Sequence, residues 1–173
     1  VLAHTSDAFI KPLAGTKNIL ISTENHSRVK FGATKIQDGL KKLKIQSEIN
    51  TVDKIRSNTQ QVVIGVYSDV IFKNQLPDAI RQKVLAMGKE GFYIYTDKKG
   101  IFVIGADPSG ALYGCVELVE RIEKEGKIPQ SLAIGDHPEM ILRGTCIGLQ
   151  KPDYLPGRDV YEYPYTPETF SWF

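Results

Sequence analysis

The sequence predicts an α+β (mixed α/β) fold in which helices pack on one side of a mixed β-sheet. Short apolar, β-branched runs alternate along the chain with segments whose apolar residues recur every three or four positions. In addition, two of the apolar runs flank a tight polar turn, which indicates antiparallel pairing beside the parallel strands that strand–helix–strand order implies. The 173 residues, 42% of them hydrophobic, are enough to bury a sizeable core.

The first third of the chain predicts three strands and one helix. Strands are expected at 18–22, 45–49 and 62–66, and the nearly continuous β-branched run of the third suits the middle of a sheet. After the first strand, apolar residues recur at alternating steps of four and three, which predicts an amphipathic helix over about 28–43. Its apolar face comprises Val29, Ala33, Ile36, Leu40 and Leu43.

The middle of the chain predicts a helix, a hairpin and a second, longer helix. Pro77 or Asp78 begins the first helix and Gly88 ends it. Strands at 91–96 and 101–105 flank a turn at 97–100. Asp107 is the expected N-cap of the last helix, which ends near Gly126. Its predicted core stripe is Leu112, Cys115, Val119 and Ile122, widened by Ala111, Val116 and Leu118.

The composition changes at about residue 137, so we expect one domain over 1–137 and a segment of different character over 138–173. The last 22 residues hold four of the nine prolines and seven of the sixteen aromatic residues. So many prolines exclude a regular sheet register, whereas the aromatic side chains favour burial. We therefore expect this tail to pack against a partner outside the chain.

Charge and hydropathy exclude several classes of partner. The net charge is +2, and the basic residues are scattered, so nothing supports a nucleic-acid partner or a charged membrane surface. No apolar run reaches the roughly 18–20 residues that a membrane span needs.

The residues with metal-binding or nucleophilic chemistry lack the spacing that such sites need. His4, His26 and His137 have no metal-ligand spacing, so we expect neither a metal site nor a cofactor. Cys115 and Cys146 each lie among apolar neighbours, which favours buried free thiols over a single disulfide. No serine has the surroundings of an activated nucleophile.

The segment from Gly105 to Gly114 joins a strand to a helix with glycines spaced as in a phosphate-binding loop. Ala111 and Leu112 stand where such a loop needs Lys and Ser or Thr, so a helix cap is the favoured interpretation. Paired glutamates at 117 and 120, and at 123 and 125, are expected on a solvated helix face in salt pairs with Arg121 and Lys124. We assign no catalytic residue in this chain.

Arg143 is the one candidate binding residue. It lies in an otherwise apolar segment, Met140 to Gly144, so its guanidinium requires a carboxylate, a carbonyl or a polyol as partner. A structural ion pair and a ligand-binding role both fit this pattern.

Three segments in order resemble a known domain: 91–95, 101–118 and Asp136-His-Pro-Glu-Met-Ile-Leu-Arg-Gly144. Together they look like the small α/β accessory domain that precedes the catalytic barrel in family 20 β-N-acetylhexosaminidases, with related domains in α-glucuronidases. The resemblance covers roughly residues 15–150. The residues after Gly144 depart from the hexosaminidase pattern, which favours a more distant relative.

The resemblance implies that residues 140–148 form the first strand of a (β/α)8 barrel that is otherwise absent. It also implies a non-catalytic N-terminal domain of a periplasmic or extracellular glycoside hydrolase, with the downstream barrel as its partner and carbohydrate as the substrate. Arg143 matches the family's sugar-binding arginine. A free-standing carbohydrate-binding module that uses aromatic residues of the tail is the alternative, and an unrelated domain without a ligand is a third.

Overall fold

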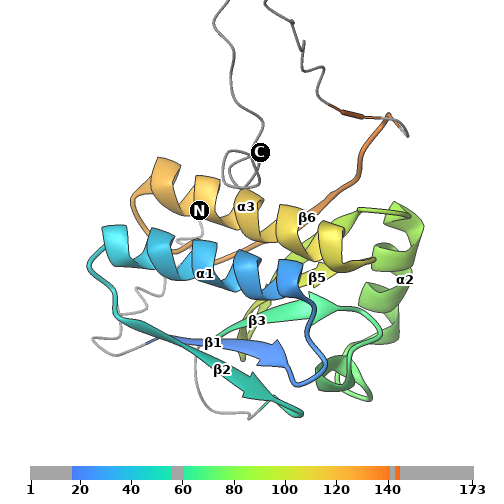
Figure 1. Cartoon of the computed structure of the whole chain (residues 1–173), viewed down its shortest axis with the longest axis horizontal. Coiled ribbons are helices and arrows are strands. Elements are labelled where there is room, and N and C mark those ends of the chain that lie inside the picture. The colour runs from blue at the N-terminus through green and yellow to red at the C-terminus, as the bar shows by residue number, and fades with distance from the viewer. Residues whose placement is uncertain (1–16, 56–60, 141–142, 145–173) are drawn as a thin grey trace, which may run out of the picture. The chain divides into compact units, whose positions relative to one another are not determined.

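The computed structural model describes residues 17–55, 61–140, 143 and 144. The chain divides into two units, Val1–Glu139 and Met140–Phe173, and all of the regular structure described here belongs to the first. Its elements are β1 Lys17–Ser22, α1 Ser27–Lys42, β2 Ser47–Val52, β3 Gln61–Val66, the 3₁₀ turn η1 Val70–Phe72, α2 Asp78–Met87, β4 Phe92–Asp97, β5 Gly100–Gly105, α3 Pro108–Glu125 and β6 Ala133–Asp136. Figure 1 shows their arrangement.

The strands form one mixed sheet in the order β2-β1-β3-β5-β4-β6. The first four strands of this order are parallel, while β4 pairs antiparallel with both β5 and β6. This arrangement confirms the mixed α/β class, the near-central place of the 62–66 strand and the predicted hairpin. The structure starts and ends the second strand a few residues later than 45–49, and it adds β6, which the sequence analysis did not predict.

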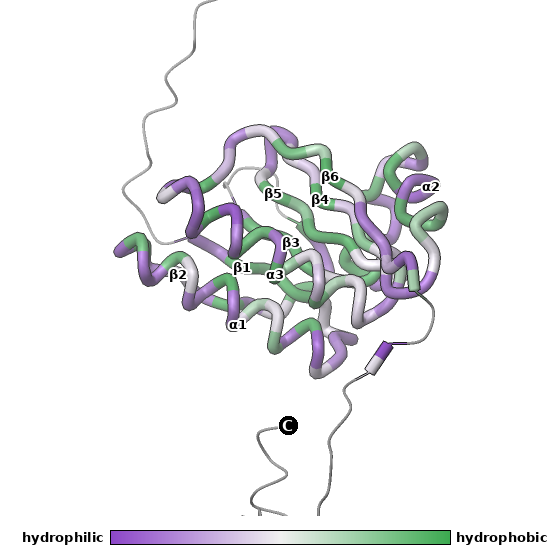
Figure 2. The backbone as a smooth tube through the Cα atoms, turned by 90° about the horizontal axis from the view of Figure 1, so that it is seen from above, coloured by the Kyte–Doolittle hydropathy of each residue, from purple (hydrophilic) through white to green (hydrophobic). Residues whose placement is uncertain are grey.

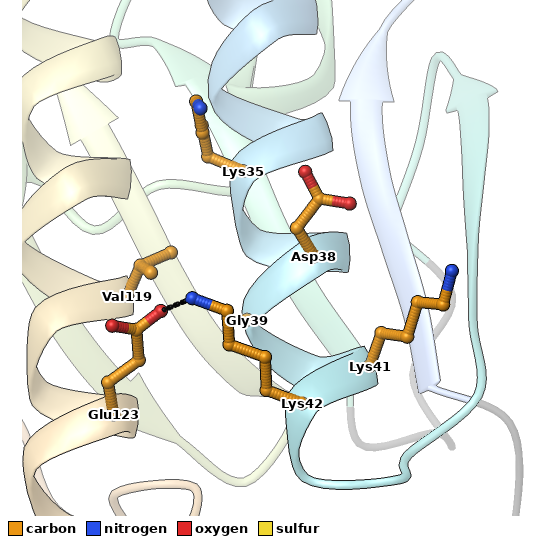
Figure 3. Close-up of a pocket in the computed structure, with 7 residues that line it drawn as sticks. All are labelled: Lys35, Asp38, Gly39, Lys41, Lys42, Val119 and Glu123. Atoms are coloured by element: carbon orange, nitrogen blue, oxygen red, sulfur yellow. Dashed lines mark hydrogen bonds and ion pairs between the residues drawn. The ribbon is translucent and has the colours of Figure 1, made fainter.

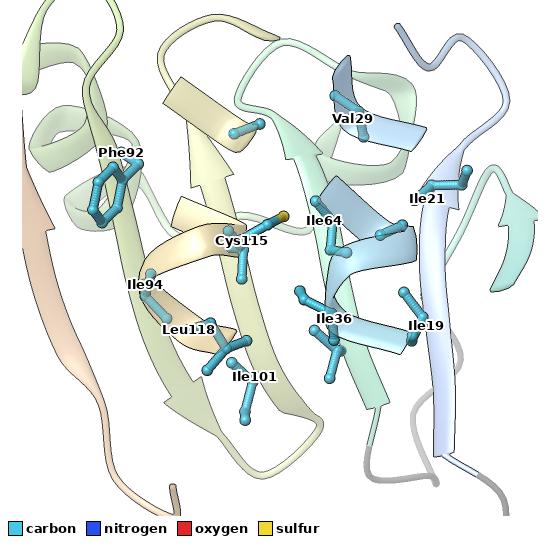
Figure 4. Packing of buried hydrophobic residues seen from close by; sticks show 14 of the residues in the cluster. Ile19, Ile21, Val29, Ile36, Ile64, Phe92, Ile94, Ile101, Cys115 and Leu118 are labelled. Atoms are coloured by element: carbon cyan, nitrogen blue, oxygen red, sulfur yellow. The ribbon is translucent and has the colours of Figure 1, made fainter. Parts of the chain in front are cut away.

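The two long helices, α1 and α3, lie side by side on one face of the sheet (Figure 1). Ile36 of α1 and Leu118 of α3 are fully buried there against strand residues such as Ile64 and Ile94, as Figure 4 shows. In Figure 2 both helices alternate between hydrophobic and hydrophilic residues, whereas the central strands are hydrophobic along most of their length. The amphipathic periodicity of α1 therefore predicts its buried face correctly.

The other face of the sheet is covered as well, so the expectation of helices on one side holds only for α1 and α3. Val84 of α2 and Phe72 of η1 are fully buried against Val63, Phe102 and Ile104. The physical reason lies in the strands, because an uninterrupted apolar run places hydrophobic side chains on both faces of a sheet and both must be covered. The short helix α2, bounded by Pro77 and Gly88 as predicted, covers part of the second face.

The predicted core stripe of α3 is partly wrong. The residues buried against the sheet are centred on Ala111, Cys115, Leu118 and Ile122. Val119 is half-buried and packs against this core as predicted, whereas Leu112 is only half-buried and Val116 is 39% exposed. The apolar residues of α3 cover more of its circumference than the sheet needs, so periodicity alone places the centre of the stripe too far toward Leu112.

Candidate functional site

The predicted site residue, Arg143, lies just beyond the last strand. Arg143 and Gly144 are exposed and belong to no helix or strand. Residues 141, 142 and 145–148 lie outside the described part of the chain, so the barrel strand expected at 140–148 stays a prediction, as does the role of Arg143. The aromatic residues of the tail and Cys146 also lie outside the described residues.

The segment that leads toward Arg143 is attached to the sheet by β6. This strand pairs antiparallel with β4, with Asp136 opposite Phe92 and Ile134 opposite Ile94. At its end the Asp136 side chain accepts a hydrogen bond from the backbone N–H of His137 at 2.8 Å. The ladder to β4 therefore determines where the chain leaves the first unit.

The glycine-rich segment after β5 is a helix cap, as the sequence favours. Asp107 Oδ1 accepts from the backbone N–H of Gly110 at 2.9 Å, which caps α3, and its Oδ2 accepts from the N–H of Glu90 at 2.7 Å. A side chain at Gly110 would overlap the carbonyl of Gly91. The glycine spacing thus reflects close packing of α3 on the β4–β5 hairpin.

The residues with metal-binding or nucleophilic chemistry have structural places. His26 caps α1 by accepting from the N–H of Arg28, and His137 is exposed. Cys115 is a buried free thiol, as predicted, and burial raises the pKa of this thiol. In the parts of the chain that the structure describes, no group of three or more His, Cys, Asp or Glu side chains is placed to hold a metal ion. His4 lies outside those parts.

The glutamates of α3 form ion pairs, although not all with the expected partners. Glu117 pairs with Arg121 at 2.6 Å within the helix, as predicted. Glu123, however, pairs across to Lys42 of α1 at 2.6 Å. That pair spans an open groove of about 550 Å³ between the two helices (Figure 3), lined by Lys35, Asp38, Gly39, Lys41, Lys42, Val119 and Glu123. Its charged groups are surface side chains that the solvent screens.

The carboxyl edge of the parallel strands carries polar groups that the sequence analysis missed. Here Arg28 of α1 donates from Nη1 to Ser109 Oγ of α3 at 2.8 Å, and Asp69 accepts from the N–H of Val66 at 2.8 Å. Burial raises the pKa of Asp69, the charge of Glu24 adds to the rise, and the bond from Val66 opposes it. The Arg28–Ser109 bond joins residues 81 positions apart, so no local pattern could have indicated it. The Asp69 bond to Val66 is local, three residues apart, and the sequence analysis did not consider it.

No helix in the described part of the chain is long and apolar enough to cross a membrane.

The family described as "Glycosyl hydrolase family 67 N-terminus" matches residues 11–118, which is more than half of the chain. The chain belongs to this family. A search of the curated proteins finds no match for this family 67 N-terminal domain. The match confirms the expected N-terminal domain of glycoside hydrolases, and the finer expectation of a family 20 hexosaminidase-like domain stays a prediction.

Solved structures of glycoside hydrolases resemble this family 67 N-terminal domain. A GH138 enzyme targeting pectin rhamnogalacturonan II has a TM-score of 0.60 and 34% identity over 91% of this chain and 20% of its own. A GH84 protein has a TM-score of 0.50 and 17% identity over 69% of this chain and 20% of its own. A family GH115 4-O-methyl-α-glucuronidase has a TM-score of 0.47 and 20% identity over 61% of this chain and 13% of its own. The chain thus spans a fifth or less of the length of these structures.

Proposed function

We propose that this domain is the non-catalytic N-terminal part of a carbohydrate-degrading glycoside hydrolase and that it supports a downstream (β/α)8 catalytic barrel. The match to the family 67 N-terminus over residues 11–118 carries the proposal. The length of the GH138 enzyme supports it, because this chain covers only 20% of that enzyme. We further propose that residues 138–173 begin the barrel and that the parent enzyme is periplasmic or extracellular.

The proposed support acts through the backbone of β6. Because β6 is hydrogen-bonded to β4 in register, a rigid sheet holds the segment from which residue 140 and its successors continue. Several of the described carboxylates serve the fold: Asp107 caps α3, Asp69 accepts from a turn N–H, and Glu117 and Glu123 form surface ion pairs. Hydrolysis of a glycosidic bond instead requires two carboxyl groups placed on either side of the bond.

Activity assays on the 173-residue chain and on the full-length enzyme test the proposal. The chain alone is expected to hydrolyse no aryl glycoside. Pectic polysaccharide is the first natural substrate to try, because the GH138 relative targets one. Deleting residues 1–139 from the full-length enzyme is expected to lower the melting temperature of the catalytic domain. Turnover by the chain alone, abolished by one carboxylate substitution within it, would refute the non-catalytic role. A deletion that left the catalytic domain equally stable and active would refute the supporting role.

We propose that Arg143 binds substrate hydroxyls in the full-length enzyme. Arg143→Lys keeps the positive charge but loses the planar fork that can engage two adjacent hydroxyls. The value of kcat/KM is therefore expected to fall by roughly tenfold or more, the scale of one or two charge-assisted hydrogen bonds. A lowered melting temperature with unchanged kcat/KM would instead show a structural role.

A further inference from the structure

Large apolar side chains are exposed on the outer side of the α1–α3 pair. Phe31 of α1 is 53% exposed, and Tyr113 and Val116 of α3 are 40% and 39% exposed. Leu112, half-buried, lies one helical turn before Val116, and its backbone faces Gly32, the neighbour of Phe31. We call these four residues, Phe31, Leu112, Tyr113 and Val116, the helix patch.

The helix patch occupies only one end of the helix pair. Its residues lie in the first half of each helix. Toward the other end the outer surface is charged, with the Lys42–Glu123 ion pair and the lysine-lined groove of Figure 3. Lys35, whose Nζ lies 5.1 Å from the centre of the Phe31 ring, marks the boundary between the two surfaces. Exposed apolar side chains gathered on one part of a surface are typical of an interaction site.

The chain leaves the first unit at the same end of the molecule. Phe92 pairs with Gly105, the last residue of β5, on one side and with Asp136, the last residue of β6, on the other. The carboxyl ends of β5 and β6 therefore lie at the same edge of the sheet. This is also the edge where α3 begins, because Asp107 and Pro108 follow β5 directly. Within the first unit, β6 therefore ends at the edge of the sheet where α3, and with it the helix patch, begins.

We propose that the helix patch is the docking surface for the downstream domain of the same protein, which contributes apolar side chains to the contact. The inference rests on the proposed function, since it names the surface through which the accessory domain supports its partner. Three observations carry it: the exposed apolar side chains, their restriction to the end of the helices where β6 also ends, and the coverage of only 20% of the similar GH138 enzyme. Attachment at that end gives the downstream domain a high effective concentration at the patch.

Hydroxyl-radical footprinting tests the surface directly. Oxidation of Phe31 and Tyr113 is compared between the 173-residue chain and the full-length protein, with Leu85 of α2 as the reference because it is 43% exposed on another helix. Docking is expected to slow oxidation of Phe31 and Tyr113 several-fold and to leave Leu85 unchanged. Equal oxidation of the patch in both proteins would overturn the proposal. Protection that depended on protein concentration would also overturn it, because a second copy of the chain would then be the occupant.

A matched pair of variants supplies a second readout. In the full-length protein, Phe31→Ser combined with Val116→Ser is expected to split one thermal transition into two, whereas Leu85→Ser leaves it single. All three positions are exposed, so the isolated chain is expected to keep its melting temperature in every variant. If deleting residues 1–139 destabilises the catalytic domain but the patch variants behave like wild type, this inference fails and the proposed function stands. If the deletion has no effect, the proposed function itself fails.

Discussion

The close approach of α1 and α3 at Gly32 gives a sharp test of the packing. A methyl group at Gly32 would lie 2.8 Å from Cys115 Sγ and 3.1 Å from Cys115 Cβ. Non-bonded carbon atoms are most stable at about 3.5–4.0 Å, and sulfur is larger than carbon. Because Cys115 is fully buried between the helices and the sheet, it has no free space to move into. Gly32→Ala must therefore push the helices apart or displace Cys115.

The magnitude follows from two opposing contributions. Overpacking a core costs about 1–3 kcal/mol, while replacing glycine by alanine inside a helix gains about 0.5–1 kcal/mol. The net loss of about 0–2.5 kcal/mol does not by itself identify the contact, so a second substitution, Cys115→Ala, removes the sulfur as well. In a Cys115→Ala background the nearest atom is the Cβ at 3.1 Å. Gly32→Ala is therefore expected to cost at least about 1 kcal/mol less there than in wild type.

Urea unfolding of the four proteins of this double-mutant cycle, followed by circular dichroism, measures the coupling. Gly39→Ala is the matched control on the same helix, because its methyl group would lie 3.3 Å from Cγ1 of Val119, a half-buried side chain beside the open groove. We expect Gly39→Ala to be neutral or to stabilise by up to about 1 kcal/mol. Additivity within about 0.5 kcal/mol between Gly32→Ala and Cys115→Ala would refute the contact. Equal damage from Gly39→Ala and Gly32→Ala would refute the packing argument.

Three further predictions concern burial, capping and charge. Leu118→Ala in the α3 core is expected to cost about 2–5 kcal/mol and Val116→Ala under about 0.5 kcal/mol, and equal losses in urea unfolding would mean that the buried face of α3 is misassigned. Asp107→Ala removes the α3 cap and a second bond from the N–H of Glu90, so it should cost about 1–3 kcal/mol, whereas Asp107→Asn should recover only part of that loss, because its single amide oxygen replaces one of the two acceptors. Since burial raises the folded pKa of Asp69, the wild type loses stability as the pH rises from the ordinary value of 3.8 through the raised one. Asp69→Asn should accordingly raise the melting temperature at about pH 7 but not at about pH 3, and an equal change at both would contradict this assignment.

The elements that the sequence predicts best are those with local physical signals at their ends. Asp107 and Gly126 bound α3, and Pro77 and Gly88 bound α2, where the sequence placed them. The hairpin follows from two apolar runs on either side of a short polar turn. Each of these features depends on residues close together in the sequence, so it can be recognised before the tertiary structure is known.

The elements that the sequence did not predict depend on tertiary contacts. β6 is four residues long, Ala133–Asp136, and only Ile134 in it is a large apolar residue, so it has no alternating pattern of its own. It forms a strand because its backbone pairs with that of β4 through antiparallel hydrogen bonds. The covering of the second face of the sheet is likewise a tertiary feature, because it depends on where α2 packs. The candidate site stays a prediction, because residues 141, 142 and 145–173 on either side of Arg143 and Gly144 lie outside the described part of the chain.

Two residues wrongly assigned to the core stripe of α3, Leu112 and Val116, belong to the proposed helix patch. Periodicity identifies the apolar residues of a helix. It does not distinguish the residues that are buried against the sheet of the same domain from those that stay exposed and can contact another domain. Leu118 and Ile122 are buried against the sheet, whereas Leu112 and Val116 lie outside the core cluster of the first unit. Exposing such side chains lowers solubility, and the downstream domain that we propose would cover them. The same two residues therefore explain both the misplaced stripe and the location proposed for the downstream domain.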